Sequence, residues 1–463
     1  MSGSFRDAVA RWGRRALVEH GTLAASLLKW TLLAAAAGLL AGASTAVFLA
    51  ILRIASAWAA ATPAPLALLP PGLLLSYLLV HWLAREAEGH GTDKVIEAVH
   101  RRWGRIPLAV APVKLAATVV TIAAGGSVGK EGPAAQIGAS FASALGSALF
   151  LRRGDHRKLV ICGIGAGFAA VFGTPIAGAI FGVEVLVMGN LFYEVLYPSF
   201  VAGLVSYLVA THLGVVYVHQ TLTTAPVSEA LLLKAVFAGI VFGLVALVLI
   251  EAMHAAESLS RRVPGPRWVL ALGGGSVLAG LAAVTSPRYL GLGIDTLESA
   301  LRGVAVPAQA WLLKIVFTSL SLACGGSGGI VTPIFFIGAT AGSTLGQLLG
   351  FDRGAFAAVG MVSVLAAAAN APIAGAIMAI EMFGPSIGPY AAISAIVSFV
   401  IVGHRSVYGS QLIGAAKSGS LVAPADIALD SLTVLERRRR ASRRKALLRA
   451  LRRRASRRRA GNA

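Results

Sequence analysis

The chain has 463 residues, of which 56% are hydrophobic and only 13% are charged, and its mean hydropathy is +0.76. Soluble domains carry about 25% charged residues, so this composition excludes a water-soluble globular protein. A helix needs about 20 apolar residues to cross about 30 Å of hydrocarbon, and the chain holds several such runs. The composition therefore predicts an all-α polytopic membrane protein.

The net charge of +21 is unevenly distributed along the chain. Residues 437–459 contain 14 Arg and Lys and no acidic residue, and four arginines lie within the first 15 residues. Basic segments beside membrane spans mark the cytoplasmic side. We therefore expect both termini in the cytoplasm, with an amphipathic segment at 1–24 and a basic tail at 416–463. The tail is expected to bind anionic lipid, and no nucleic-acid partner is expected.

Seven long apolar runs follow one another along the chain, and Gly or Pro interrupts many of them. No Lys or Arg occurs between Lys158 and Lys234. Short, tilted and broken helices of this kind are typical of transporters. The runs cover residues 31–53, 64–83, 159–183, 195–216, 231–250, 268–284 and 355–402.

Two sequence blocks recur and divide the chain into related halves. The segment GGSVGKEGP at 125–133 is echoed 200 residues later by GGSGGIVTP at 325–333. The segment PIAGAI at 175–180 recurs 197 residues later at 372–377. Related halves of membrane transporters commonly lie in opposite orientations around a midplane axis. We therefore predict one transmembrane domain at 25–415, built from two inverted repeats of tilted and broken helices, with halves at about 25–215 and 230–415.

Each glycine-rich block precedes Pro133 or Pro333, and proline is suited to the first turn of a helix. A helix that starts inside the membrane must direct its free N–H groups at protein, water or an anion. Its N-terminus carries about half a positive charge. Two such ends would form an anion site of backbone amides, with glycine allowing close approach. The alternative is that these glycines serve only tight helix packing.

Glu131 lies within the first block, where an ionised carboxylate at membrane depth costs about 2.5 to 3.5 kcal/mol. Beside helix-start amides, this carboxylate could occupy the anion site as a tethered substitute ion, and protonation would release it. The alternative is a local ion pair with Lys130.

No paired carboxylates, metal-ligand cluster or nucleophile with a base stands out, so we expect no enzymatic activity. The two cysteines show no metal-ligand spacing, and no cofactor or metal is expected. Another kind of protein, a broken-helix carrier for an organic anion, remains an alternative because helix ends can hold a carboxylate.

The motifs at 129–133 and 329–333 resemble the two signature motifs of the CLC family of chloride channels and transporters. The resemblance covers about residues 25–415. It implies a homodimer with a separate anion pathway in each subunit. In that family the glutamate matching Glu131 is the extracellular gate, the amides matching Ile330 and Val331 bind the central anion, and a tyrosine matching Tyr408 supplies a hydroxyl. Lys130, Gly132 and Gly329 complete the predicted anion-binding set.

Two positions depart from the family pattern. Family members usually have Gly-Ser-Gly-Ile-Pro where this chain has Gly-His-Gly-Thr-Asp at 89–93, so His90 replaces an anion-binding serine. A histidine there could donate to an anion or titrate near neutral pH, or turn towards cytoplasmic water. Many family exchangers also carry an inner glutamate for protons where this chain has Val185.

The sequence therefore predicts chloride transport across the cell membrane, gated by Glu131, with chloride as the bound substrate. The missing inner glutamate favours channel-like or weakly proton-coupled transport. A coupled chloride/proton antiporter and a fluoride exporter remain open alternatives.

Overall fold

The structure is a computed structural model, which describes residues 2–217, 219–222, 229–417 and 429. These residues form sixteen α-helices, a few single-turn 3₁₀ helices and one parallel pair of short strands. Six helical segments are long and apolar enough to cross a membrane. The all-α membrane fold is thus confirmed. Nearly all of the predicted basic tail at 416–463 lies outside the described residues.

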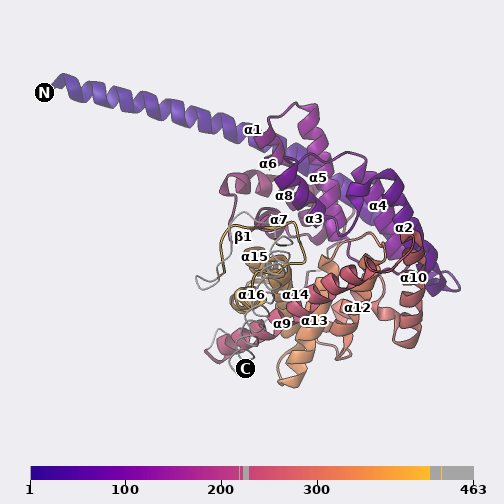
Figure 1. The fold of residues 1–463 in the computed structure, drawn as a ribbon. Coiled ribbons are helices and arrows are strands. Elements are labelled where there is room, and N and C mark those ends of the chain that lie inside the picture. Colours follow the sequence, from indigo (N-terminus) through magenta and orange to yellow (C-terminus); the bar gives the residue numbers. More distant parts are fainter. Residues whose placement is uncertain (1, 218, 223–228, 418–428, 430–463) are drawn as a thin grey trace, which may run out of the picture.

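The first half of the chain begins with a single helix that continues beyond the body of the molecule (Figure 1). This helix runs unbroken through residue 24, where we had divided the amphipathic segment from the membrane domain. The elements of this half are α1 (Ser2–Ala60), α2 (Leu69–Leu83), α3 (Thr92–Arg101), α4 (Val110–Ala123), α5 (Glu131–Ala148), α6 (Arg153–Phe172), α7 (Pro175–Glu184), β1 (Val187–Met188) and α8 (Tyr193–His212).

The second half repeats the order of short and long helices. The strand β2 closes it and pairs in parallel with β1 of the first half. Its elements are α9 (Glu229–Ser260), α10 (Arg267–Val284), α11 (Ile294–Leu301), α12 (Ala310–Ala323), α13 (Val331–Leu348), α14 (Arg353–Ala369), α15 (Pro372–Phe383), α16 (Gly388–Val402) and β2 (Leu412–Ile413).

Broken helices occur where the apolar runs are longest. The run at 159–183 divides into α6 and α7 at Gly173, which has a φ of +70°. The run at 355–402 divides at Asn370, which has a φ of +54°. Both residues adopt the left-handed conformation that ends a helix, which glycine and asparagine tolerate better than other residues.

Six helices lie outside the predicted apolar runs, namely α3, α4 and α5 in the first half and α11, α12 and α13 in the second. The α4 and α12 helices have 14 residues each and are apolar but shorter than a membrane span. The α5 and α13 helices have 18 residues each and are rich in Gly, Ala, Ser and Thr. These last four helices flank the two repeated glycine blocks, and this arrangement confirms the two-repeat fold.

Small residues allow these helices to pack backbone against backbone. A Cβ atom on Gly138 of α5 would meet the Gly163 carbonyl of α6 at 2.6 Å. A Cβ atom on Gly338 of α13 would collide with the Gly360 carbonyl of α14 in the same manner. Close contact through small residues is the usual way in which membrane helices associate. Tight packing therefore accounts for the glycines inside these helices, but not for those in the loops before them.

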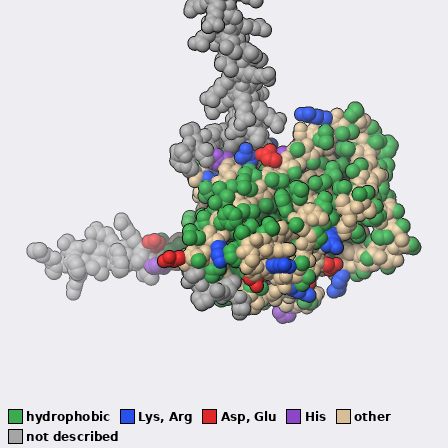
Figure 2. Space-filling view, turned by 90° about the horizontal axis from the view of Figure 1, so that it is seen from below, with side chains coloured by type: hydrophobic (Ala, Val, Ile, Leu, Met, Phe, Trp, Pro, Cys, Tyr) green, Lys and Arg blue, Asp and Glu red, His purple; other side chains and the backbone are tan. Residues whose placement is uncertain are grey.

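The exterior of the molecule matches a lipid environment. Figure 2 shows a face covered largely by hydrophobic side chains, with charged side chains gathered towards its edges. Large apolar residues such as Trp58, Trp82 and Val284 are strongly exposed. Such a surface suits hydrocarbon and would be unfavourable in water.

Two glutamates join the halves by capping each other's helices. Glu184, at the end of α7, accepts hydrogen bonds from the backbone N–H groups of Ile373 (3.0 Å) and Ala374 (2.8 Å) at the start of α15. Glu381 of α15 accepts the equivalent bonds at the start of α7. A carboxylate at a helix N-terminus satisfies free amides and complements the helix dipole. This reciprocity explains why both glutamates recur at matched positions.

We predict that Glu184→Ala lowers the free energy of unfolding by about 1.5 to 3 kcal/mol, because it leaves two buried amides without a charged acceptor. The thermal midpoint in detergent would show this loss. Glu194→Ala is a suitable control, since Glu194 is exposed and makes only a surface ion pair with Lys158. Equal stability of the Glu184→Ala protein and the wild type would contradict the capping role.

Candidate anion site

The two glycine-rich loops meet directly between the halves. The Gly129 N–H donates to the Gly329 carbonyl (2.6 Å), and the Gly329 N–H donates back to the Gly129 carbonyl (2.5 Å). Equivalent residues that bond to each other in this way lie on an approximate twofold axis. A Cβ atom on Gly329 would lie 2.7 Å from the Gly132 nitrogen, so the loops could not approach this closely with larger residues.

Each loop is also anchored by helices of the other half. In the first loop, the Ser127 N–H donates to the Ser321 hydroxyl of α12 (2.9 Å). In the second, the Ser327 N–H lies within hydrogen-bond distance of the Thr121 hydroxyl of α4 (3.1 Å) and the Ser76 hydroxyl of α2 (3.2 Å). These contacts position the starts of α5 and α13 against one another at the centre of the molecule.

Glu131 is the first residue of α5 and is buried. Its carboxylate accepts a hydrogen bond from the Thr332 N–H (3.0 Å) and another from the Thr332 hydroxyl (2.5 Å). Thr332 belongs to the first turn of α13, so the carboxylate of one half lies at the helix N-terminus of the other. The carboxylate therefore occupies a position suited to an anion.

The other residues predicted in the two motifs are placed as follows. Lys130 and Ile330 are the N-cap residues of α5 and α13, so both helices begin two residues before the prolines. No ion pair joins Lys130 to Glu131 in the described part of the chain. The amides of Ile330 and Val331 lie at the α13 start, where N–H groups have no partner within the helix.

Thr332 is the anion-site residue that sequence reasoning missed. It precedes Pro333 in the second block, at the position that Gly132 holds in the first. A hydroxyl at a helix start inside an apolar chain is a visible signal, because such a group needs a polar partner.

The inner part of the site gathers polar atoms that lack partners. His90 Nδ1, the Thr92 hydroxyl and the Tyr408 hydroxyl are buried and make no hydrogen bond with any described residue. The rings of His90 and Tyr408 lie 5.7 Å apart. A Cβ atom on Gly132 would collide with the His90 carbonyl and would lie 3.3 Å from the Thr92 hydroxyl. Since buried polar groups normally have partners, this arrangement suits a ligand that accepts hydrogen bonds.

The loop that carries His90 belongs to a third sequence block that recurs in the second half, which we had not recognised in the sequence. Gly-His-Gly-Thr-Asp at 89–93 matches Gly-Leu-Gly-Ile-Asp at 291–295, and all four glycines have positive φ angles. Lys114 donates to the carbonyls of Ala87 (3.0 Å) and Gly89 (2.5 Å) and to the Ser327 hydroxyl (3.0 Å). Lys314, 200 residues later, binds the carbonyls of Tyr289 and Gly291.

The segment that carries Tyr408 is held by buried side-chain amides. Gln411 donates to the carbonyls of Val185 (2.9 Å) and Ala369 (3.0 Å), and it accepts from Asn370 (2.8 Å). These bonds attach the segment to α7 of one half and α14 of the other. At the start of α3, the Asp93 carboxylate accepts bonds from the N–H and hydroxyl groups of Ser410. Tyr408 is therefore fixed beside the His90 loop.

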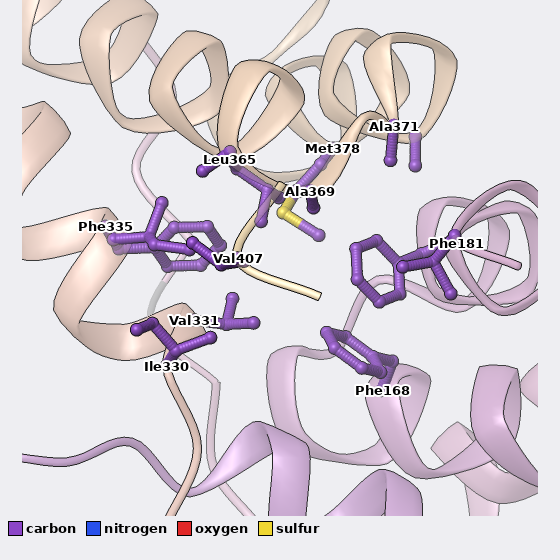
Figure 3. Close-up of a cluster of buried hydrophobic side chains, with 14 of the residues drawn as sticks. Phe168, Phe181, Ile330, Val331, Phe335, Leu365, Ala369, Ala371, Met378 and Val407 are labelled. Atoms are coloured by element: carbon purple, nitrogen blue, oxygen red, sulfur yellow. The ribbon is translucent and has the colours of Figure 1, made fainter. Parts of the chain in front are cut away.

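An apolar cluster closes the opposite side of the site. The side chains of Phe168 and Phe181 from the first half face those of Val331 and Met378 from the second (Figure 3). Only the backbone of Val331 is thus available to an anion, as expected for a site made of amides.

A cavity of about 720 Å³ leads to the site from one end of the molecule. It is lined by α2, α3, α9, α12, the second glycine-rich loop, the loop of His90 and the segment around Tyr408, and His90 is among its lining residues. Its charged lining residues comprise five basic ones, Arg85, Lys94, Arg101, Arg261 and Arg267, and four acidic ones, Glu88, Asp93, Glu97 and Glu257. In the described residues, no group of three His, Cys, Asp or Glu side chains is placed to hold a metal ion.

Comparison with known proteins identifies the family. A family profile described as a voltage gated chloride channel matches residues 72–403. The chain belongs to the CLC family. A chloride/fluoride channel protein of Pseudomonas syringae pv. tomato is 39% identical over 399 residues, which are 84% of this chain and 88% of that protein. A voltage-gated ClC-type chloride channel of Escherichia coli is 30% identical over 68% of this chain and 77% of its own.

Solved CLC structures share the fold. A CLC-type fluoride/proton antiporter superposes with a TM-score of 0.79 at 31% identity, covering 84% of this chain and 98% of that one. A slow cyanobacterial Cl⁻/H⁺ antiporter superposes with a TM-score of 0.71 at 20% identity, covering 81% of this chain and 94% of its own. The antiporters named in these comparisons carry different anions, so the shared fold alone does not define the anion of this chain.

We predict that Glu131→Ala exposes the α13 N-terminus to a soaked anion, because the carboxylate no longer occupies it. A crystal of this variant soaked in bromide should show an anomalous peak beside the amides of Ile330, Val331 and Thr332. The wild-type crystal, in which the carboxylate competes for the same groups, should show a weaker peak. Bromide found only on the surface of both crystals would contradict the site.

Proposed function

We propose that this CLC protein transports halide ions through a pathway in which the Glu131 carboxylate and the halide compete for one site. The carboxylate bound by Thr332 is the observation that carries the proposal. An ionised Glu131 fills the α13 N-terminus and excludes a second anion. Protonation removes its charge, weakens both hydrogen bonds and lets a halide replace it.

Fluoride is the halide that this geometry favours. The site holds a carboxylate oxygen through a 2.5 Å hydroxyl contact, and His90, Thr92 and Tyr408 offer further polar groups nearby. Fluoride is small and accepts short, strong hydrogen bonds, as a carboxylate oxygen does. The relatives named for fluoride add support, at 39% and 31% identity. Chloride, predicted from the signature motifs, is the second candidate and is supported by the family as a whole.

The orientation proposed from charge places the cavity on the cytoplasmic side. Its five basic lining residues fit the rule that Lys and Arg gather at cytoplasmic loops. Both termini would then be cytoplasmic, and Glu131 would lie towards the outside of the inner anion site. The homodimer implied by the family and the binding of the basic tail to anionic lipid complete the proposal.

Glu131→Ala tests the proposal in liposomes. We expect halide efflux to persist, and to be equal at about pH 7 and about pH 4, on either side of the ordinary glutamate pKa of about 4.3. Wild-type efflux should rise on acidification over the same interval. Ion-selective electrodes for fluoride and chloride would measure both rates and show which halide moves faster. A variant that keeps the wild-type pH profile would contradict the gating role.

Thr332→Val removes the hydroxyl that holds the carboxylate but keeps the backbone amide. A hydrogen bond to a charged group contributes about 1.5 to 3 kcal/mol, so release of Glu131 should become easier and efflux at neutral pH should rise. Thr340→Val is a matched control, because Thr340 lies on the same helix and bonds only to backbone carbonyls. An unchanged efflux in Thr332→Val, measured with the same electrodes, would show that the hydroxyl does not restrain the gate.

A further inference from the structure

The closed end of the cavity contains a histidine that nothing in the fold requires. We propose that His90 exchanges protons between the cavity and Glu131, so that proton movement accompanies halide movement. This inference rests on the proposed halide transport and deepens it. It also replaces our sequence-based preference for channel-like transport, which depended on Val185 at the position of the family's inner glutamate.

His90 lies between water and the anion site. His90 is among the residues that line the cavity, while its Nδ1 atom is buried and has no hydrogen-bond partner among the described residues. The same ring contacts Tyr408, and the His90 carbonyl lies against Gly132, the residue after Glu131. A titratable ring in this position can take a proton from cavity water and present it to the buried site.

The matching loop of the second half shows that the imidazole has no role in building the loop. Leu292 occupies the position of His90, between two glycines of positive φ, and it packs against an apolar cluster. The loop shape is set in both halves by these glycines and by a buried lysine that binds their carbonyls. A polar residue is therefore not needed to fold this loop, and the histidine is present at only one end of the pathway.

Other described histidines near this end are less suited to the role. His100 of α3 bonds to the Leu186 carbonyl (3.0 Å), and His156 bonds to the Ser143 hydroxyl (3.1 Å). Neither lines the cavity, and His81 and His254, which do, make no ring contact with Tyr408. The charged groups that act on His90 come from α3, α4 and α9, and they are Asp93, Lys94, Lys114 and Glu257.

The proton step involves no change in the halide. Cavity water gives a proton to the imidazole, which becomes an imidazolium ion. The imidazolium passes that proton to the Glu131 carboxylate, directly or through water, and returns to its neutral form. The neutral carboxyl group leaves Thr332, and a halide from the opposite face takes its place. The proton then leaves Glu131 towards that opposite face, and the returning carboxylate displaces the halide into the cavity. Each cycle thus moves a proton one way and halide the other.

Reversal potentials of reconstituted protein under crossed halide and proton gradients test this step, because they give the number of protons per halide whatever the rate. We expect the wild type to move protons with halide. In His90→Ser, which has the residue usual in the family, we expect proton coupling to vanish. His100→Ser, on the helix α3 that follows the His90 loop but away from the cavity, should keep the wild-type number of protons per halide.

The role of His90 would be overturned if His90→Ser kept the wild-type number of protons per halide, or if His100→Ser lost proton coupling to the same extent. A wild type that moves halide without protons would overturn it too, while leaving the proposed function intact. A wild type that moves no halide would instead overturn the proposed function. Should His90→Ser carry no halide, His90→Asn takes its place, because asparagine is polar but does not titrate. A wild-type number of protons per halide in that variant would overturn the role of His90.

Discussion

A helix that begins inside a membrane has free N–H groups that lipid cannot satisfy, and the whole arrangement follows from this constraint. The two loops before α5 and α13 meet through the reciprocal bonds of Gly129 and Gly329, which bring both helix starts together. The same constraint acts at α7 and α15, where Glu184 and Glu381 satisfy the free amides permanently. The fold thus satisfies such amides in two ways: Glu184 and Glu381 stay at helix ends as structural caps, and Glu131 is the carboxylate that we propose an anion replaces.

The difference between these carboxylates lies in their surroundings. Glu184 and Glu381 each bind two backbone amides of a partner helix, and neither lies at the end of the cavity. Glu131 binds one amide and one hydroxyl, and it adjoins a loop whose His90 lines that cavity. All three groups are carboxylates, so it is access to protons that distinguishes the structural caps Glu184 and Glu381 from the proposed gate Glu131. Within the membrane, an ionised Glu131 without donors and helix-start amides without an acceptor are both costly. In the proposed transport, protonation of Glu131 is therefore linked to halide binding.

Much of the fold and part of the candidate site could be predicted from sequence, because the repeats and glycine blocks reflect constraints on the backbone. The halves, the broken helices and the position of Glu131 at a helix start all followed from Gly, Pro and spacing. The partner of Glu131 did not, since Thr332 approaches it only when the halves fold together across 201 residues. The third sequence block was missed because only its two glycines and aspartate are shared. Short helices such as α4 and α12 were missed because they are apolar over only 14 residues, fewer than the roughly 20 that a membrane span needs.

Function in this molecule arises where the repeat symmetry fails. The scaffold pairs Gly129 with Gly329, Lys114 with Lys314 and Glu184 with Glu381, and these matched residues hold the halves together. At three matched positions beside the candidate site the halves differ: Glu131 aligns with Val331, Gly132 with Thr332, and His90 with Leu292. A strictly symmetric site would treat both membrane faces alike. In the proposed transport, Glu131 serves one face and His90 the other, so protons enter and leave through different groups. The gradients of protons and halide then set the direction of transport.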